Sequence, residues 1–210
     1  LAEAQETRMY TFSWVLLSAA ALALLRATRP ATRRAWPWWL AFALFAAAGL
    51  LTHYSTVLIL AAWGLWLLAW ALRGPERTVR LRTLALVGLA TFVLCLPALP
   101  IALRQIAIYH NPNLNLPDLP SYLAQLYHAF ALGEHVPASA LSVGRWLWLL
   151  VPLGGAVLAL REPRKRHTLA LLALWLFGGL ALYYVILTRR SAFNPRYISF
   201  VLPAVWAAQS

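Results

Sequence analysis

The sequence is short of the charged groups that cover the surface of a soluble protein. Charged residues make up 11% of its 210 residues and hydrophobic residues 62%, whereas soluble domains carry roughly 25% charged and 45–50% apolar residues. This shortage excludes a disordered chain and argues against a soluble globular domain, because lipid removes the need for a polar surface. We therefore expect an integral membrane protein, and the mean hydropathy of +0.67 agrees.

Cysteine and acidic residues are also scarce. The single cysteine, Cys95, excludes an intrachain disulfide and a cysteine-based metal cluster. Only 6 acidic residues oppose 18 basic ones, which gives a net charge of +12. On a soluble fold such a surplus would indicate a nucleic-acid partner. Here every basic residue except Lys165 is an arginine, and these arginines lie between apolar runs. Membrane topology explains the charge more simply, and we expect no nucleic-acid partner.

Long apolar runs dominate the chain, and a membrane-spanning helix needs about 20 mainly apolar residues. No stretch alternates apolar and polar residues with a period of two, so strands are not expected. The sequence predicts an all-α, polytopic integral membrane protein with a single transmembrane domain over 1–210. About seven spans are expected, at 9–25, 35–51, 54–72, 83–103, 144–160, 168–187 and 197–209.

The basic residues predict how these spans are oriented. Segments 26–34, 73–82 and 161–167 fall on one side of the membrane and hold two-thirds of the basic residues. The positive-inside rule assigns that side to the cytoplasm. The N-terminus, a hairpin at His53 and the loops 104–143 and 188–196 then face outward. Tryptophans near span ends, such as Trp36, Trp38 and Trp39, are typical of the interfacial belt.

Two polar motifs lie at the expected outer face. Glu6, Arg8 and Tyr10 stand at the mouth of the first span, and Glu6 shares a helix face with Tyr10. They form either a charged helix start or the polar rim of an outward cavity. His53 and Tyr54 form a tight hairpin between the second and third spans, where an imidazole offers a titratable donor or acceptor beside a phenol. An ordinary interfacial pair is the alternative.

Two outer loops add further candidates. Segment 121–132 has apolar residues at helical spacing, among them Tyr122 and Leu126, with Ser121 as the expected N-cap. It predicts a short amphipathic helix on the outer membrane surface, which contacts lipid or guides a lipid substrate. In the second loop Arg189, Arg190 and Arg196 break the positive-inside trend. Because the guanidinium fork suits phosphate, this cluster predicts a site for a lipid-borne phosphate; a solvated turn that tolerates arginine is the alternative.

Sequence signals for a metal site are weak. The histidines are scattered without metal-ligand spacing, and no glycine-rich phosphate loop occurs. We predict no metal-binding residues from the sequence.

Three of these motifs together resemble a known family. The stretch 5–10, Gln-Glu-Thr-Arg-Met-Tyr, resembles the Q-E-x-R-M-Y segment that opens a middle span in bacterial family 39-type glycosyltransferases. Thr52-His53-Tyr54 resembles their T-H-Y outer hairpin. Arg196-Tyr197, followed by Pro203, resembles the start of a late span. The matches occur in family order over most of the chain. These proteins belong to the GT-C superfamily, with its PMT-like, ArnT-like and RgtA/B/C/D-like members.

The resemblance implies a glycosyltransferase of the bacterial plasma (inner) membrane. Such enzymes move a sugar from a polyprenyl-phosphate-linked donor to a lipid, glycan or protein acceptor on the outer, periplasmic face. Arg190 and Arg196 would bind the departing phosphate. The resemblance allows a divalent metal ion as cofactor but does not require one. The substrate-binding residues implied are Arg8, Tyr10, His53, Tyr54, Arg190, Arg196 and Tyr197.

The usual catalytic carboxylate of this family lies in its first outer loop. Because the chain opens with Leu1 and no signal peptide precedes the first apolar run, we interpret the chain as an internal fragment. The general base is then expected upstream of Leu1, with Glu6 as a candidate contributor.

Two other functions stay open at this point. An O-antigen ligase- or polymerase-like enzyme would also join lipid-linked sugars, although a longer central outer loop would favour it. A non-catalytic transporter or scaffold subunit would place charges or broken helices near the bilayer midplane.

Overall fold

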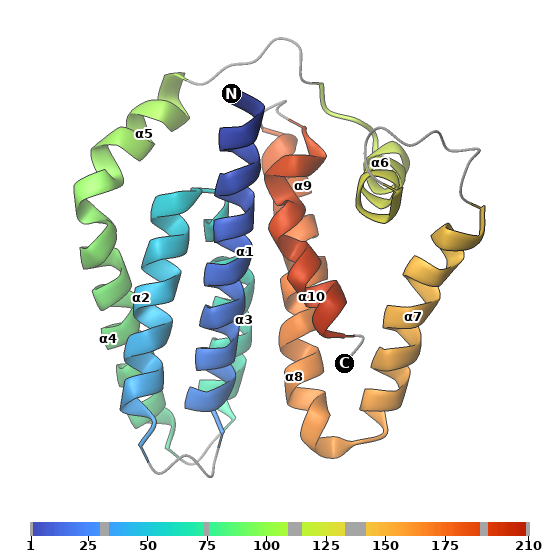
Figure 1. Ribbon diagram of the computed structural model, residues 1–210. Helices are drawn as coiled ribbons and strands as arrows, with labels where there is room; N and C mark the ends of the chain where they lie inside the picture. Colours follow the sequence, from blue (N-terminus) through green and yellow to red (C-terminus); the bar gives the residue numbers. More distant parts are fainter. Residues whose placement is uncertain are drawn as a thin grey trace. The chain divides into compact units, whose positions relative to one another are not determined.

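The computed structural model describes residues 2–29, 34–73, 76–108, 115–132, 142–189 and 193–208. Across these ranges the regular structure is helical and contains no strand, so the predicted all-α class is confirmed. The chain divides into two compact units, Leu1–Tyr109 and His110–Ser210. We call them unit 1 and unit 2 and describe each by itself (Figure 1). The single transmembrane domain expected over 1–210 stays a prediction.

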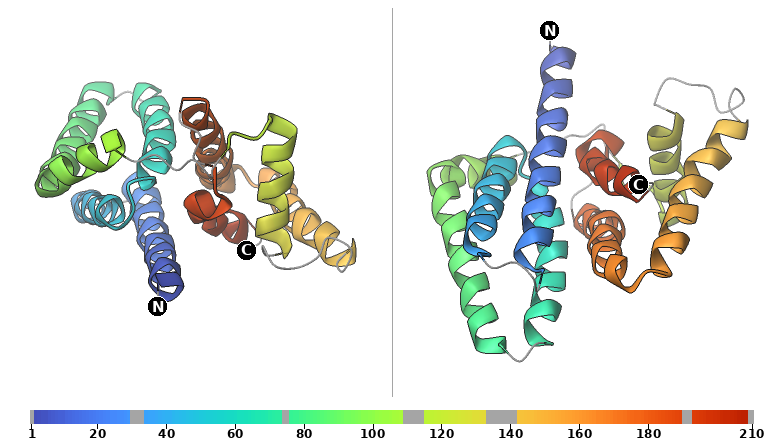
Figure 2. Two further views of the ribbon diagram at one scale, coloured as in Figure 1. Left: turned by 90° about the horizontal axis from the view of Figure 1, so that it is seen from above. Right: turned by 60° about the horizontal axis from the view of Figure 1, so that its bottom comes forward.

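Unit 1 is a bundle of helices. It contains α1 (Ala2–Ala27), α2 (Trp36–Thr52), α3 (Thr56–Leu72) and α4 (Arg77–Cys95), which continues through η1 (Leu96–Ala98) into α5 (Leu99–Ile108). Helix α1 packs against α2, and α2 packs against α4, an arrangement visible in Figures 1 and 2. Alanines are buried on both α1 and α2, among them Ala20, Ala23, Ala43 and Ala46. Such small side chains let neighbouring helices approach closely.

Prolines change the helix geometry where α4 passes into α5. Pro97 and Pro100 lack the backbone N–H that an α-helix would use, and the chain tightens into the 3₁₀ turn Leu96–Ala98 before it resumes as α5. Within α4 the only buried residue is Val87, while apolar side chains such as Leu86, Leu89 and Phe92 are exposed. A helix that is apolar and open on most sides suits contact with lipid.

Unit 2 begins with α6 (Leu119–Leu132) and α7 (Ser142–Leu160). A nearly continuous helix follows, made of α8 (Pro163–Ala173), the π-helical turn η3 (Leu174–Gly178) and α9 (Gly179–Leu187). The 3₁₀ helix η4 (Pro195–Val201) then leads into α10 (Leu202–Ala207). In Figure 1, α6 is seen end-on while α7 and α8 are seen lengthwise, so α6 crosses the direction of these two helices.

The expectation of seven spans is corrected by the lengths of the helices. Among the described residues three helical stretches are long and apolar enough to cross a membrane, namely Tyr10–Ala27, Arg77–Gln105 and Lys165–Leu187. Helices α2 and α3 have 17 residues each, about 26 Å at 1.5 Å per residue, which is shorter than a hydrocarbon core of about 30 Å. In α7 the apolar stretch found is Leu150–Leu160.

The span expected over 197–209 is a different structure. Its first part belongs to the 3₁₀ helix η4, and only 6 residues, Leu202–Ala207, form α10. Pro195 and Pro203 lie in the first turns of these two elements. Proline is tolerated there because its missing N–H is not needed in a first turn, whereas it would interrupt one continuous α-helix.

The amphipathic helix expected over 121–132 is present as α6, but its cap differs. The helix begins at Leu119, and the Oδ1 atom of Asp118 accepts a hydrogen bond from the backbone N–H of Ser121 at 2.9 Å. Asp118, rather than Ser121, therefore caps α6, which places Pro120 in the first turn where it is tolerated. Ser121 lowers the pKa of Asp118, mainly through a hydrogen bond from its side chain and secondly through the one from its backbone N–H. The placement of α6 on the outer membrane surface stays a prediction.

Candidate functional site

The hairpin between α2 and α3 holds His53 in a defined position. The backbone N–H of His53 donates to the carbonyl of Gly49 at 2.9 Å, and the His53 carbonyl accepts from the N–H of Thr56 at 3.0 Å. The buried Thr56 hydroxyl also donates to the Gly49 carbonyl, at 3.2 Å. A Cβ on Gly49 would stand 3.2 Å from Cγ2 of Thr56. Glycine at this position therefore allows the close approach of α3 that fixes the hairpin.

Three of the predicted site residues meet at this hairpin. The His53 ring lies 5.3 Å from the Tyr10 ring of α1, tilted by 40°, and 5.3 Å from the Tyr54 ring, nearly parallel at 21°. Tyr10 and His53 are both buried to 8% exposure, whereas Tyr54 is 46% exposed. The result is a short aromatic stack that runs from the interior to the surface of unit 1. We call Tyr10, His53 and Tyr54 the hairpin stack.

The environment of His53 sets its protonation state. Burial lowers the pKa of His53 from 6.5 to about 4, so the ring is neutral at neutral pH. Nδ1 of His53 accepts the backbone N–H of Ser55 at 3.3 Å. An accepting Nδ1 puts the proton of the neutral imidazole on Nε2. His53 can therefore donate a hydrogen bond through Nε2, but it does not offer a positive charge to a phosphate.

In unit 2, Arg196 lies in the 3₁₀ helix η4, and hydrogen bonds of Asn194 fix the start of this helix. The side-chain Oδ1 of Asn194 accepts the backbone N–H of Arg196 at 2.9 Å and so caps the 3₁₀ helix η4. The Tyr183 hydroxyl donates to the Asn194 carbonyl at 3.2 Å and accepts the Asn194 N–H at 3.2 Å. These bonds anchor Asn194 to α9. Arg196 and Tyr197 follow immediately, and both are partly buried.

An aromatic cluster joins α6 to this segment. Tyr122 of α6 is buried, and its hydroxyl donates to the carbonyl of Leu180 in α9 at 2.8 Å. Its ring lies 4.9 Å from Tyr184 and 5.3 Å from Phe193, with Tyr183 at 6.4 Å. Burial, followed by the neighbouring Tyr183 and Tyr184, raises the pKa of Tyr122 well above its ordinary value. Tyr122 is therefore a protonated donor that ties α6 to α9.

Sequence reasoning missed the aromatic cluster as a feature of the site. In the sequence Tyr122 stands out only by its helical spacing, and Tyr183, Tyr184 and Phe193 lie within or beside an apolar run. The spacing of Tyr122 and Leu126, both buried in the structure, indicates a buried helix face but not the residues that cover it. The partners of that face come from α9 and η4, more than 50 residues away in the sequence.

Several predicted residues are only partly described. Arg190 lies outside the described residues, and for Glu6 and Arg8 the backbone belongs to α1 while the side chains lie outside the description. Arg189 is exposed in the turn that follows α9. The hairpin stack belongs to unit 1, and Arg196 and Tyr197 belong to unit 2. Their joint participation in one site stays a prediction.

The described residues contain no group of three or more His, Cys, Asp or Glu side chains that could hold a metal ion. We therefore assign no metal ligands in these ranges and derive no step through a metal. No family model matches the sequence, and comparisons with curated proteins and with solved structures likewise find no match.

Proposed function

We propose that this chain is part of a membrane glycosyltransferase that moves a sugar from a polyprenyl-phosphate-type lipid to an acceptor on the outer face of the bacterial plasma membrane. The proposal rests on the resemblance of three motifs, and one structural observation supports it most. That observation is the hairpin stack, in which two of these motifs, at Tyr10 and at His53–Tyr54, come into ring contact. Two motifs 43 residues apart in the sequence thus form one local cluster, of which Tyr54 is the exposed member.

The chemistry of the hairpin stack fits a neutral polar ligand such as a sugar. Aromatic faces with a few placed donors are typical of small-molecule sites. His53 is neutral at neutral pH because burial lowers its pKa, and it holds its proton on Nε2 because Nδ1 accepts the N–H of Ser55. A neutral donor beside two phenol rings suits hydroxyl groups better than it suits an anion. We assign sugar or acceptor contact to this stack for that reason.

Phosphate recognition falls to arginine in this proposal. The guanidinium of Arg196 belongs to a segment fixed by the Asn194 cap and by Tyr183. Fixed cations stabilise a leaving group most when they are in place before charge develops. We assign Arg196, with Arg190 and the Tyr197 hydroxyl, to the phosphate of the donor lipid.

The proposed reaction is a substitution at the anomeric carbon of the donor sugar. An acceptor hydroxyl or amine forms a new bond to that carbon, and the bond to the phosphate oxygen breaks, its electron pair leaving on the lipid phosphate. A carboxylate removes the acceptor proton. The proposal assigns this role to an acid outside the site residues named here, with Glu6 as a candidate contributor.

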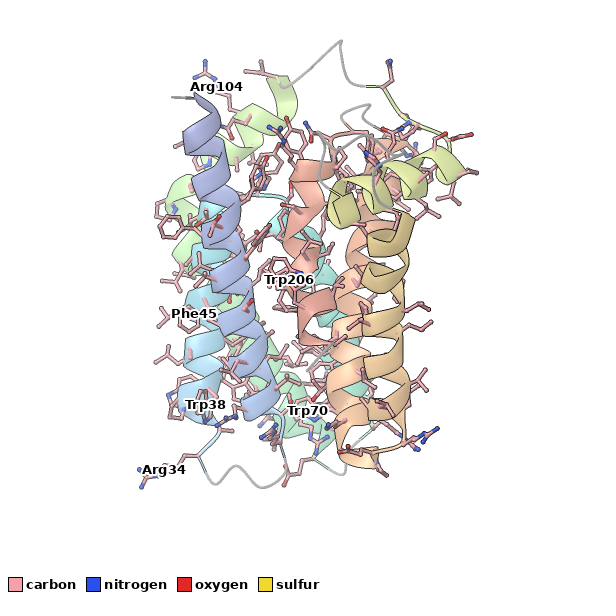
Figure 3. The ribbon with its side chains drawn as sticks, turned by 45° about the vertical axis from the view of Figure 1, so that its right-hand side comes forward. Arg34, Trp38, Phe45, Trp70, Arg104 and Trp206 are labelled. Carbon is pink, nitrogen blue, oxygen red and sulfur yellow. The ribbon has the colours of Figure 1, made fainter. Side chains whose placement is uncertain are left out.

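The topology of the proposed enzyme places the N-terminus and the hairpin stack outside and the arginine-rich turns of unit 1 inside. Figure 3 supports this for unit 1, because Arg34 and Arg104 lie at its two opposite ends, with Trp38 and Trp70 near the Arg34 end. This orientation of unit 1 requires the 17-residue helices α2 and α3 to cross the membrane as well. Local thinning of the bilayer accommodates short helices at modest cost.

A transfer assay with an arginine variant tests the proposal. The full-length protein is reconstituted in vesicles with labelled polyprenyl-phosphate sugars, and the release of sugar from the lipid is followed. Arg196→Ala should lower the rate at least tenfold, in line with the loss of a charge-stabilising donor. Arg104→Ala, an exposed arginine of unit 1, is the matched control and should leave the rate within twofold. Equal rates for both variants would remove Arg196 from the mechanism.

A further inference from the structure

The end of unit 1 away from the hairpin stack carries two arginine–tryptophan pairs. The guanidinium carbon of Arg26, in the last turn of α1, lies 5.6 Å from the centre of the Trp38 ring in the first turn of α2. The guanidinium carbon of Arg80, in the first turn of α4, lies 4.5 Å from the Trp70 ring near the end of α3. Each pair therefore bridges the turn between two consecutive helices.

The second pair is the more closely held. Nη1 of Arg80 donates a hydrogen bond to the carbonyl of Trp70 at 3.1 Å, while its guanidinium lies over the indole of the same residue. A guanidinium carries five N–H donors in a fixed fork, and this bond occupies one of them. The ring contact and the hydrogen bond together fix the position of the Arg80 guanidinium at this end of unit 1.

The two pairs lie at the same end of unit 1. Trp39, next to Trp38, is buried, and its ring lies 5.9 Å from the ring of Trp70. Figure 3 shows Trp38 and Trp70 at the same end of unit 1, with Arg34 beyond them. Further arginines around these turns are exposed. The surface, which we call the arginine–tryptophan rim, consists of Arg26, Arg29, Arg34, Trp38, Trp70, Arg73, Arg77, Arg80 and Arg82.

The charge of the rim is almost entirely of one sign. Among the described residues of these turns Glu76 is the only acid. Like charges gathered at one end of a helix bundle repel one another, and an external anion relieves this repulsion. Tryptophan side chains settle at the level of the lipid headgroups, so the rim holds its guanidinium groups at the depth where lipid phosphates lie.

We propose that the arginine–tryptophan rim binds the headgroup phosphates of anionic phospholipids, with Arg80 as its anchoring cation. An anionic lipid offers a phosphate without the compensating ammonium of a zwitterionic one, and the guanidinium fork matches phosphate oxygens. Clusters of basic residues at the ends of membrane helices gain about 1 kcal/mol per residue from anionic lipid surfaces. This inference concerns the end of unit 1 opposite the hairpin stack and does not depend on the proposed transferase activity.

Lipid titration of the full chain tests the inference. The protein is purified in a neutral detergent, and binding of phosphatidylglycerol and of phosphatidylcholine is counted by native mass spectrometry. The unchanged protein should bind phosphatidylglycerol more tightly than phosphatidylcholine. Arg80→Gln should weaken phosphatidylglycerol binding about fivefold and leave phosphatidylcholine binding unchanged. Arg104→Gln removes an exposed charge at the other end of unit 1 and should leave both unchanged.

Two further variants keep the test decisive if Arg80→Gln does not fold. Arg26→Gln removes the cation of the other pair, and Trp70→Phe keeps an aromatic ring but weakens the contact with the cation, since tryptophan is the strongest partner for this interaction. Each should reduce phosphatidylglycerol binding selectively. The inference is overturned if the unchanged protein shows no preference for phosphatidylglycerol, or if Arg104→Gln weakens binding as much as the rim variants do.

Discussion

The backbone N–H of Ser55 donates to Nδ1 of His53, at 3.3 Å. This bond fixes the orientation of the imidazole between Tyr10 and Tyr54, and it determines which nitrogen carries the proton while the ring is neutral. A local turn thereby sets both the geometry and the charge of the hairpin stack. Burial of His53 also disfavours a second proton on the ring, because it penalises the charged form and so lowers the pKa.

The stability of unit 1 should therefore depend on pH through His53. Its pKa is lowered from 6.5 to about 4 in the folded state, so the unfolded chain binds the proton more readily. Stability is fully present above about pH 6.5 and is lost as the pH falls from there towards 4. Thermal unfolding in detergent at pH 7 and pH 5 measures this loss. His53→Gln should flatten the difference between these two values, and an unchanged difference in the variant would assign the effect to other groups.

A pair of glycine substitutions tests the close packing of the hairpin. At Gly64, in the middle of α3, a Cβ meets nothing within 4 Å, so Gly64→Ala should stabilise the protein by about 0.5–1 kcal/mol. At Gly49 the new methyl group would press on the fully buried Thr56 at 3.2 Å. Gly49→Ala should cost about 1 kcal/mol or more. Unfolding midpoints that shift in the same direction would contradict this account of the hairpin.

The contact between α6 and α9 should depend on Tyr122. Tyr122→Phe removes the hydrogen bond to Leu180 and should cost about 1 kcal/mol, whereas Tyr122→Ala also empties a buried site and should cost about 3–5 kcal/mol. Leu123→Ala, at a neighbouring position that is 50% exposed, is the control and should change stability by less than about 0.5 kcal/mol. Similar losses from positions 122 and 123 would show that α6 is not anchored through this ring.

The cap on η4 links stability to the proposed phosphate site. Asn194→Ala leaves the N–H of Arg196 without its side-chain acceptor and should cost about 1 kcal/mol. Asn194→Asp keeps an acceptor and should retain most of that stability. If Arg196 acts on the donor phosphate, the alanine variant should also slow transfer while the aspartate variant remains closer to the unchanged protein. A variant that loses stability without losing transfer would limit Asn194 to a structural role.

Some elements were predictable because one local feature decides them. Apolar length alone predicted the helices that contain Tyr10–Ala27, Arg77–Gln105 and Lys165–Leu187. The short polar interruption at His53 predicted a tight hairpin, which the structure has between α2 and α3. The helical spacing of Tyr122 and Leu126 predicted α6. In each case neighbouring residues carry the whole signal.

Other elements depend on partners that the sequence does not reveal. Ser121 and Asp118 are both good caps, and only the position of the α6 start selects Asp118. The apolar run after Arg196 is typical of a span, but Pro195 begins a 3₁₀ helix and Pro203 divides the run. The Phe200 carbonyl accepts a hydrogen bond from Nε1 of Trp175 at 2.9 Å. The aromatic cluster around Tyr122 needs α6, α9 and η4 to meet, which periodicity cannot indicate.

The most direct test of the proposed function is transfer by the unchanged full-length protein. Vesicles that contain it are supplied with a panel of polyprenyl-phosphate-linked sugars, each labelled in the sugar, and with cell-envelope lipids as acceptors. Labelled sugar should pass from one of these donors to an acceptor on the outer side of the vesicle. Arg196→Ala should slow this transfer at least tenfold. Absence of both transfer and donor binding across the panel would contradict the proposed function and leave a non-catalytic membrane role.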